Sequence, residues 1–293
     1  MKKKLLLIET DIGTDVDDAI ALTVLCKKAP TQLFGIICTN GPVYIRTQIT
    51  SMLLKSLQLS SIPIFQGFSN SSTPKKKKFV TNKEPEGIEI CSKPNSRKNL
   101  IHKILQCNDQ TITLIIIAPP TTSAWLLQNP HVKKKIEKII IMGGVCPKPH
   151  IPLNEHNFSC DPRAVSTIIK SDKPLFVLSL DQTLKFPLSK IISSQLAKKK
   201  SKTAILISRW MITWIAWSKK FIGENSCFKE KIFLHDPLAC MAVIQPNLFH
   251  WKKTNSTIDA NGVICFDKGN PIHICTKIEQ KVRQEIEKIL TTL

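Results

Sequence analysis

Four carboxylates crowd a short segment near the start of the chain. Asp11, Asp15, Asp17 and Asp18 lie within eight residues, and Gly13 separates the first two. Carboxylates this close repel one another, which raises their pKa values unless a positive charge lies among them. Hard divalent cations such as calcium and magnesium prefer oxygen ligands of this kind. The segment therefore predicts a metal-binding or catalytic loop.

Two simpler explanations of the acidic segment are available. Asp is favoured at helix N-termini, where it accepts hydrogen bonds from free backbone N–H groups and suits the helix dipole. One or two acids would satisfy that need, whereas this segment has four. An EF-hand loop that began at Asp15 would place Ile20 at its sixth position, where that motif requires Gly. A metal or catalytic loop remains the better interpretation.

The acidic segment joins a predicted strand to a predicted helix, and this alternation continues along the chain. The apolar pattern predicts strands at Leu5–Ile8, Leu33–Thr39, Pro63–Phe65, Thr111–Ile117, Lys138–Met142 and Leu175–Leu180, and helices at Asp18–Lys27, Tyr44–Leu57, Asn99–Cys107, Ser123–Gln128 and Pro162–Lys170. Continuous apolar strands separated by helices are typical of a parallel sheet covered on both faces. We therefore expect an α/β fold with a doubly wound, mostly parallel sheet, in a single domain over residues 1–293.

Polar side chains follow the predicted strands at the points where the strands end. In doubly wound sheets, ligands bind outside the carboxyl ends of the strands. The polar residues that follow the strands are Asp11, Asp15, Asp17, Asp18, Asn40, Thr121, Glu155, His156, Asn157, Asp161, Asp181 and Thr183. We expect these side chains to gather at one edge of the sheet.

Composition limits the class of protein and its cellular location. The chain has 293 residues, 42% of them hydrophobic, and no apolar run approaches the roughly 18 residues of a membrane span. The Lys-rich start is followed by only a short apolar stretch and then by acids, which argues against a secretion signal. Ten cysteines without a Cys-x-x-Cys pair indicate reduced thiols. We expect a cytoplasmic protein without a membrane partner.

The formal net charge of +20 comes mainly from lysine. Runs of lysine occur at Lys2–Lys4, Lys75–Lys78, Lys133–Lys135 and Lys198–Lys200. These runs are dispersed and carry no interleaved aromatic residues, so solvated loops and helix faces explain them best, and no stable nucleic-acid partner is expected. A basic nucleic-acid-binding protein without hydrolase activity remains the alternative from another class, and it predicts an affinity that falls steeply with salt.

Several motifs resemble, in the same order, those of the inosine–uridine-preferring nucleoside hydrolase family. The longest is Asp11-Ile-Gly-Thr-Asp-Val-Asp-Asp-Ala-Ile-Ala-Leu. The others are Asn40 after the second strand, Ala118-Pro-Pro-Thr121-Thr, Ile141-Met-Gly-Gly144, Glu155-His-Asn157-Phe-Ser-Cys-Asp161-Pro-Arg-Ala and Phe233-Leu-His235-Asp236-Pro-Leu-Ala. The resemblance spans residue 5 to about residue 270.

The resemblance implies a calcium-dependent enzyme that hydrolyses the N-glycosidic bond of a ribonucleoside to ribose and free base, in nucleoside salvage. It implies that calcium is bound by Asp11, Asp18, Asp236 and the backbone carbonyl of Thr121. It also implies that the ribose hydroxyls are held by Asp17, Asn40, Glu155 and Asn157. Asp15 is left as a supporting residue. Family members are often dimers or tetramers, so a homo-oligomer is implied by analogy.

The chemistry of the reaction suits two of these residues. Cleavage of a ribosyl bond passes through an oxocarbenium-like state that water attacks. Asp11 would touch both the metal and this water, which suits a general base. His235 adjoins the implied ligand Asp236 and titrates near neutral pH, so it is the candidate acid for the departing base. An inactive calcium-binding relative is a further alternative, against which intact Asp11 and His235 argue.

The chain departs from the family pattern around the implied base and 5′-hydroxyl positions. Pro149 stands where many members carry Asn, and His156 stands where they carry Phe. A His-Gly motif after the third strand is not evident, and Glu86-Gly87-Ile88 is the nearest segment to it. A family member that acts on a modified or 5′-substituted nucleoside therefore remains an alternative.

Some candidate residues are better explained by structure than by chemistry. Asp161 before Pro162 predicts a helix N-cap followed by Pro at the first helical position. Asp181 and Thr183 are expected to serve turns or caps. Trp210, Trp214 and Trp217 fall at helical spacing, and we expect them in the core rather than in a wall that stacks on a base.

Overall fold

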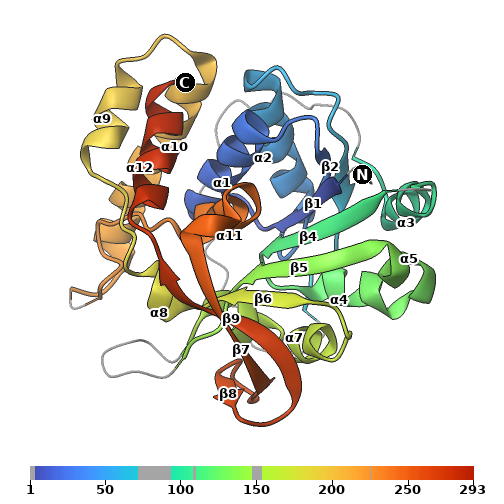
Figure 1. Cartoon of the computed structure of the whole chain (residues 1–293). Coiled ribbons are helices and arrows are strands. Elements are labelled where there is room, and N and C mark those ends of the chain that lie inside the picture. Colours follow the sequence, from blue (N-terminus) through green and yellow to red (C-terminus); the bar gives the residue numbers. More distant parts are fainter. Residues whose placement is uncertain (1–3, 72–93, 108–109, 147–153, 225) are drawn as a thin grey trace.

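One mixed sheet forms the centre of the molecule (Figure 1). The computed structural model describes residues 4–71, 94–107, 110–146, 154–224 and 226–293. In these ranges the strands lie in the order β3 (Ile64–Gln66), β2 (Leu33–Cys38), β1 (Lys4–Thr10), β4 (Thr111–Ile117), β5 (Ile136–Met142), β6 (Leu175–Leu178), β9 (Asn270–Ile278), β7 (Phe249–Ile258) and β8 (Ile264–Phe266). Neighbours from β3 to β9 are parallel, and β7 runs antiparallel to both β9 and β8. The expected α/β fold with a mostly parallel sheet is confirmed.

Helices cover both faces of the sheet (Figure 1). One face is covered by α1 (Asp17–Lys28), α2 (Val43–Ser56), α9 (Ile191–Ala197), α10 (Lys202–Phe221), α11 (His235–Ile244) and α12 (Lys281–Thr291). The other is covered by α3 (Arg97–Leu105), α4 (Thr121–Gln128), α5 (Pro130–Lys135) and α7 (Pro162–Ile169). The remaining helices are short, namely α6 (His156–Cys160), α8 (Leu180–Thr183) and the 3₁₀ helix η1 (Pro246–Leu248).

The two helical layers explain why the strands are apolar without interruption. Side chains alternate between the two faces of a strand. On β1, Leu6 and Ile8 pack into one core, whereas Leu5 and Leu7 pack into the other. Because both faces are buried, apolar side chains are favoured at consecutive positions of such a strand, and a buried polar residue such as Glu9 must find hydrogen-bond partners.

The order of the strands reverses beside β1. The chain passes from β1 to β2 and β3 on one side and then crosses to β4 on the other side of β1. The reversal opens a crevice at the carboxyl ends of β1 and β4, which is where doubly wound sheets bind ligands. Strand β1 ends at Thr10, directly before Asp11, and α4 begins at Thr121 shortly after β4. The topology therefore brings two of the predicted site residues to this crevice.

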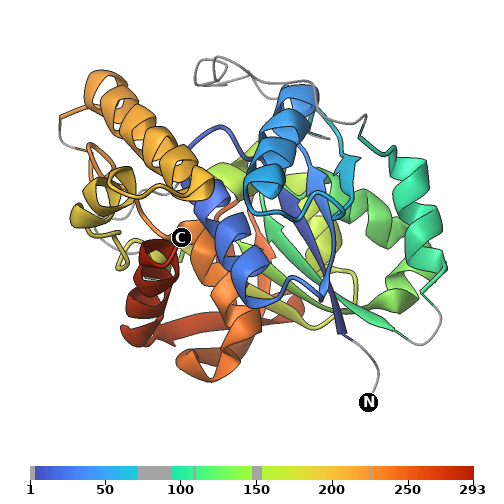
Figure 2. The same ribbon diagram turned by 90° about the horizontal axis from the view of Figure 1, so that it is seen from above.

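Helices α9, α10 and α12 gather at one end of the molecule in both ribbon views (Figures 1 and 2). Helix α10 begins at an N-cap in which Ser201 accepts a hydrogen bond from the backbone N–H of Ala204. The hydroxyl of Thr203 donates to the carbonyl of Ser56, at 2.9 Å, and so ties α10 to α2. The aromatic residues along α10 are thereby fixed beside the sheet edge that carries the acids.

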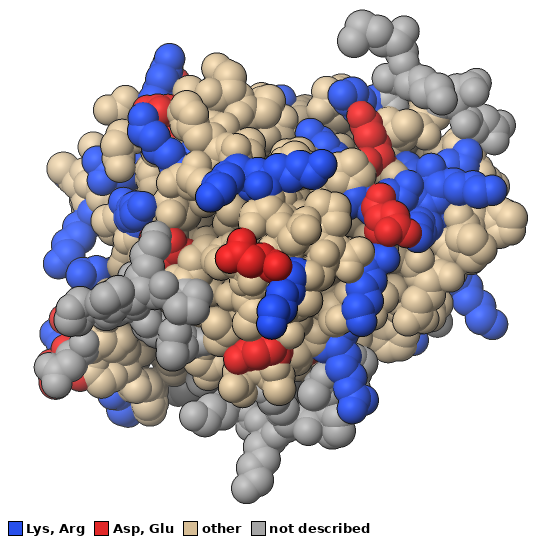
Figure 3. Space-filling view, turned by 60° about the horizontal axis from the view of Figure 1, so that its bottom comes forward, with Lys and Arg blue, Asp and Glu red and all other residues tan. Residues whose placement is uncertain are grey.

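The surface charge and the state of the cysteines agree with the expectations from composition. Figure 3 shows Lys and Arg side chains spread over one face of the molecule with acidic residues between them. All nine cysteines in the described part of the chain are free. No helix among the described residues is long and apolar enough to cross a membrane.

Candidate active site

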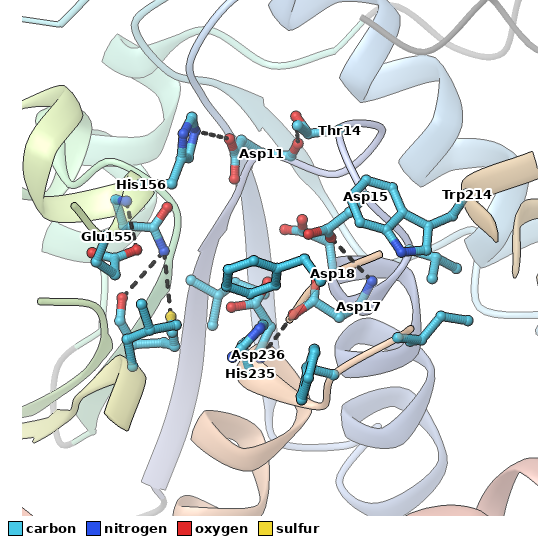
Figure 4. A pocket seen from close by; sticks show the side chains of 18 of the residues that line it. Asp11, Thr14, Asp15, Asp17, Asp18, Glu155, His156, Trp214, His235 and Asp236 are labelled. Carbon is cyan, nitrogen blue, oxygen red and sulfur yellow. Dashed lines mark hydrogen bonds and ion pairs between the residues drawn. The ribbon is translucent and has the colours of Figure 1, made fainter. Parts of the chain in front are cut away.

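A cavity of about 400 Å³ opens at the carboxyl ends of β1, β4 and β5. Its lining includes most of the residues predicted from the sequence, which are Asp11, Asp15, Asp17, Asp18, Glu155, His156, Asn157, His235 and Asp236 (Figure 4). Asn40 and Thr121 are not among the lining residues. Asn40 lies behind Asp11 and donates from Nδ2 to Asp11 Oδ2 at 3.1 Å. The hydroxyl of Thr121 donates to Asp161 Oδ2 at 2.7 Å.

The carboxylates of the loop accept hydrogen bonds from the loop itself, from β1 and from the start of α11. Asp15 Oδ1 accepts a hydrogen bond from the backbone N–H of Asp17, at 3.2 Å. Asp17 Oδ2 in turn accepts from the backbone N–H of Asp236, also at 3.2 Å. Asp18 Oδ1 accepts from the hydroxyl of Thr10. These bonds bring the N-terminal loop against a segment more than two hundred residues away in the sequence.

This group of carboxylates fits a cation. Oxygens of Asp15, Asp17 and Asp18 lie within 4.8 Å of one another. Burial, followed by repulsion from neighbouring carboxylates, raises the pKa of Asp17, Asp18 and Asp236 well above the usual range. Such buried acids are costly to ionise unless a positive charge lies among them. The cluster could therefore hold a metal ion, and Asp15, expected only to support the loop, belongs to it.

The stability of the protein without a bound cation is expected to fall as the pH rises. The folded chain holds protons on Asp17, Asp18 and Asp236 to a higher pH than the unfolded chain does. Their contribution is therefore fully present below their ordinary pKa of 3.8 and is lost as the pH rises through the raised folded values. Melting temperatures measured with chelator should therefore fall as the pH is raised above the ordinary carboxyl pKa of 3.8.

Saturating calcium provides the comparison for this pH series. A bound cation favours the ionised carboxylates, so the same melting curves recorded with calcium should show a flatter dependence on pH. A chelated protein whose melting temperature rises with pH above 3.8, or shows the same pH dependence as the calcium-loaded protein, would contradict the raised pKa values.

Asp11 differs from the other acids because cations lie beside it. Its Oδ2 is 3.9 Å from the Arg46 guanidinium and 3.7 Å from His156 Nε2. Burial by itself would raise the pKa of Asp11, but the hydrogen bond from His156 and the charge of Arg46 outweigh it and lower the pKa. Asp11 is thus the ionised carboxylate of the cavity, a state that a general base requires.

Sequence reasoning missed Arg46, which lies on α2 and is buried beneath the acidic loop. Its guanidinium donates to the backbone carbonyls of Asn40, Asp11 and Ile12, the last at 2.8 Å, and to the hydroxyl of Thr14 at 3.0 Å. One signal was available in the sequence. Arg46 shares a helix face with the apolar residues Ile49 and Leu53, and an Arg at such a position must find buried partners.

Glu9 is a second buried residue that sequence reasoning missed. Its carboxylate accepts hydrogen bonds from the backbone N–H groups of Thr122 and Ser123, at 3.1 and 2.9 Å, and from the hydroxyl of Ser123. Burial raises the pKa of Glu9 to about 7, although these bonds partly oppose the change. Glu9 therefore fixes the start of α4, where the predicted ligand Thr121 lies.

Glu155 and Asn157 are held firmly on the opposite side of the cavity. Glu155 caps α6, since its Oε1 accepts from the N–H of Asn157 at 2.7 Å and its Oε2 from the N–H of Phe158 at 2.9 Å and of Gly144 at 2.7 Å. Asn157 donates from Nδ2 to the carbonyl of Met142 at 3.2 Å. Gly144 has φ of +71°, and a Cβ there would lie 2.7 Å from the Phe158 ring, so only glycine fits this turn.

His156 extends from the same helix into the cavity and faces Asp11 (Figure 4). Its side chain is 48% exposed. Burial by the surrounding chain would lower the pKa of His156, but the hydrogen bond to Asp11 outweighs it and raises the pKa well above the usual range. The departure from the family pattern at this position therefore lies inside the cavity.

His235 is fixed at the start of α11 by a residue that we expected to serve only a turn. Its Nδ1 lies 2.7 Å from the hydroxyl of Thr183. The same hydroxyl donates to the carbonyl of Leu180 at 3.2 Å, which favours the tautomer in which His235 donates to it, so we assign the ring proton to Nδ1. Burial lowers the pKa of His235 to about 4, with Asp15 opposing the change. The ring is therefore neutral near pH 7 and leaves Nε2 without a proton.

Aromatic side chains line the cavity together with the acids. Trp214, Trp217, Phe228 and Phe233 line it. The rings of Trp214 and Trp217 stack with centroids 5.3 Å apart, and Phe233 stacks on His235 at 5.4 Å. The expectation that the tryptophans belong to the core is wrong for Trp217, which lines the cavity half-buried, whereas Trp214 packs against the core and also lines the cavity. Trp210 does pack against the core.

Asp161 and Asp181 were expected to have structural roles rather than chemical ones. Asp161 is the N-cap of α7, accepting from the N–H of Ala164 at 3.1 Å, with Pro162 at the first helical position as predicted. Asp181 accepts hydrogen bonds from the N–H of Cys146 and the side chain of Gln182. The departures at Pro149 and Glu86–Ile88, and the lysine run Lys75–Lys78, lie outside the described residues.

Comparison with known proteins points to one family. The family model described as inosine-uridine preferring nucleoside hydrolase matches residues 6–285. Uridine nucleosidase 1 of Arabidopsis thaliana is 25% identical over 277 residues, which are 89% of this chain and 80% of that protein. The non-specific ribonucleoside hydrolase RihC of Shigella dysenteriae is 23% identical over 302 residues, 94% of this chain and 93% of its own length.

Solved structures show the same fold. A plant nucleoside hydrolase, PpNRh1, superimposes with a TM-score of 0.83 at 20% identity and full coverage of both chains. A purine-preferring ribonucleoside hydrolase from Gardnerella vaginalis superimposes with a TM-score of 0.80, also at 20% identity, over 99% of this chain and 100% of its own.

Proposed function

The chain belongs to the inosine-uridine preferring nucleoside hydrolase family, and from this premise we propose that its cavity hydrolyses a ribonucleoside to ribose and a free base. One observation carries the proposal. Buried carboxylates and aromatic rings line the same cavity. Carboxylates suit the hydroxyls of a ribose, and aromatic faces suit the stacking of a base. Nucleoside salvage is the role that such a reaction would serve.

We propose that the cation of this site is calcium. The residues that would hold it are Asp11, Asp18, Asp236 and the carbonyl of Thr121. Asp15 is a further candidate ligand, because its carboxylate oxygen lies close to those of Asp17 and Asp18. When bound, the cation would supply positive charge that makes a water molecule more acidic. Calcium accepts six to eight oxygen ligands in flexible geometry, which suits a loop so rich in carboxylates.

Asp11 is the proposed general base. It is ionised in the cavity, and its Oδ2 is oriented by the amide of Asn40. A carboxylate held in this way can take a proton from a water molecule that attacks the anomeric carbon of the ribose. Oriented side chains contribute to the rate because they lose little entropy when the substrate binds.

The ribose hydroxyls are assigned to Asp17, Asn40, Glu155 and Asn157. The backbone bonds to Glu155 occupy one lone pair on Oε1 and two on Oε2, so Oε1 is the atom with capacity to accept from a hydroxyl. Asn157 is immobilised by the Met142 carbonyl. These residues therefore bind and orient the sugar without taking part in proton transfer.

His235 is the proposed partner of the departing base. Its ring lies in the cavity, stacked on Phe233, with Nδ1 bonded to Thr183. In this tautomer Nε2 accepts a hydrogen bond from the base when the ring is neutral and donates a proton to it once the ring has gained one. Orientation of the base is the first role that this geometry supports, and proton donation is the second.

A modified or 5′-substituted nucleoside is a second candidate substrate. The observation that favours it is His156. This residue lines the cavity, and it stands at the position where the family pattern described above has Phe. An imidazole can donate a hydrogen bond to a polar substituent, which a phenyl ring cannot. The two candidates differ in which substrates the enzyme turns over efficiently.

A substrate panel tests the proposed function. We expect ribose to be released from at least one member of a set of purine, pyrimidine, base-modified and 5′-substituted nucleosides, with the Asp11→Asn variant as the inactive control. Release of ribose only from the modified or 5′-substituted members would favour the second candidate. No ribose from any member, together with nucleic-acid affinity that falls steeply with salt, would instead support a basic nucleic-acid-binding protein.

A further inference from the structure

Arg46 connects three parts of the site from beneath. Its Nε donates to the carbonyl of Asn40, its Nη1 to the carbonyls of Asp11 and Ile12, and its Nη2 to the hydroxyl of Thr14. A planar guanidinium presents its donors in a fixed fork, so these four acceptors cannot move independently. The side chain is almost fully buried, with 4% of its surface exposed. It therefore joins the proposed base, the proposed ribose ligand and the metal loop into one unit.

Asn40 needs this support because its backbone is in an unusual conformation. Its φ is +63°, in the left-handed region that side chains other than glycine adopt only at a cost. Its backbone N–H donates to the carbonyl of Phe68 at 2.7 Å, and its carbonyl accepts from Arg46. With the backbone held at both groups, the side-chain amide is aimed at Asp11 Oδ2.

The contacts of Arg46 are directed mainly at the backbone rather than at a charge. Three of its acceptors are main-chain carbonyls, and among the described residues the one carboxylate oxygen within ion-pair distance, Asp11 Oδ2, is its most distant partner at 3.9 Å. A residue whose purpose was to neutralise the acids would face their carboxylates directly. Its hydrogen bonds show instead that it shapes the path of the chain from Asp11 to Thr14.

We propose that Arg46 is a positioning residue of the hydrolase site, which sets Asp11 and Asn40 in place before cation and ribose bind. The inference rests on the proposed function of the cavity. It assigns a role to a residue that does not line the cavity and that would act through the residues it holds.

Calcium affinity separates positioning from simple charge, because the two roles predict opposite signs. If Arg46 acted only as a positive charge near the loop, its removal would relieve repulsion and strengthen the binding of a cation. If it positions the loop, its removal weakens binding, because the ligands must then be ordered when the cation arrives. Loss of a residue that orients metal ligands typically costs 10- to 100-fold in metal affinity.

The experiment is a calorimetric titration of the metal-free full-length protein with calcium. Arg46→Met removes the charge and the fork, Arg46→Lys keeps the charge but loses the fork, and Thr14→Val removes one acceptor. We expect calcium affinity to fall about tenfold or more in both Arg46 variants and by a smaller factor in Thr14→Val. Arg209→Met, at an exposed position of α10, is the matched control for loss of an arginine and should leave affinity and activity unchanged.

Steady-state kinetics provides a second measurement on the same variants. Because Arg46 holds both the proposed base and Asn40, kcat should fall and KM should rise in Arg46→Lys at saturating calcium, although its melting temperature remains close to that of the wild type. If Arg46→Met does not fold, Arg46→Lys and Thr14→Val still decide the question.

Several results would overturn the inference. Tighter calcium binding by Arg46→Met would show that Arg46 acts as a charge, and so would wild-type affinity and kinetics in Arg46→Lys. These outcomes leave the proposed function intact, provided that the wild-type protein binds calcium and releases ribose. A wild-type protein that does neither would overturn the proposed function itself.

Discussion

Replacement of Asp11 by Asn is expected to lower kcat by about three orders of magnitude, within the range that general-base catalysis supplies. Asn keeps the size of the side chain but cannot accept a proton from water. It also removes the ionised carboxylate that Arg46, Asn40 and His156 surround in the cavity. Ribose release under saturating substrate, compared with the wild type at equal calcium, measures the effect.

The fold should survive this change, since Asn is nearly isosteric with Asp and the backbone carbonyl of Asp11 still accepts from Arg46. Asp172→Asn is a matched control, because Asp172 is exposed, lies outside the cavity and has a φ of +60° that Asn also tolerates. A near-normal kcat in Asp11→Asn would remove Asp11 from the role of base. A large loss in Asp172→Asn would show that the assay reports a general effect of the substitution.

Exhaustive removal of divalent cations is expected to reduce activity by at least about a hundredfold, because a metal ion typically contributes several kcal/mol to catalysis. The structural reason is the group of buried carboxylates around Asp15, Asp17 and Asp18. Without a cation, burial and mutual repulsion raise the pKa values of Asp17, Asp18 and Asp236 and so disfavour the ionised carboxylates that a substrate site of this kind requires. Ribose release before chelation, after chelation and after add-back of each cation measures the effect.

The add-back series identifies the metal. Calcium should restore activity, and magnesium should restore it less well, because magnesium demands a near-ideal octahedral site and gives up its waters reluctantly. Activity that survives complete metal removal would overturn the metal assignment. Full recovery with magnesium and none with calcium would retain the metal but reject calcium as its identity.

The strands and helices of the parallel part of the sheet could be predicted from the sequence because their signal is local. Residues Thr111–Ile117 form a strand with the predicted bounds, and the first strand is longer than predicted, Lys4–Thr10 instead of Leu5–Ile8. An unbroken apolar run reports burial on both faces, whatever the rest of the chain does. The long strands β7 and β9 were not assigned from the sequence. Their half-exposed antiparallel pairing depends on which strand lies beside them.

The residues of the candidate site could be named in advance because their motifs are contiguous. The acidic segment, the segment Glu155–Asn157 and the pair His235–Asp236 were each predicted, and all of them line one cavity. Their partners could not be named. Asp17 bonds to the backbone of Asp236, 219 residues away, and Thr183 bonds to His235, 52 residues away. No local pattern carries information about such pairings.

By itself, the sequence determined the class of the sheet and the edge at which its polar residues gather. It also determined the crowding of acids, which favours the binding of a cation. Only the tertiary structure decided what surrounds those acids. It placed Arg46 beneath Asp11, Glu9 against the start of α4 and Trp214 in the same cavity as the carboxylates. The reason is physical: the ionisation and orientation of a buried group depend on the charges and hydrogen bonds that distant segments bring to it, and folding alone creates that environment.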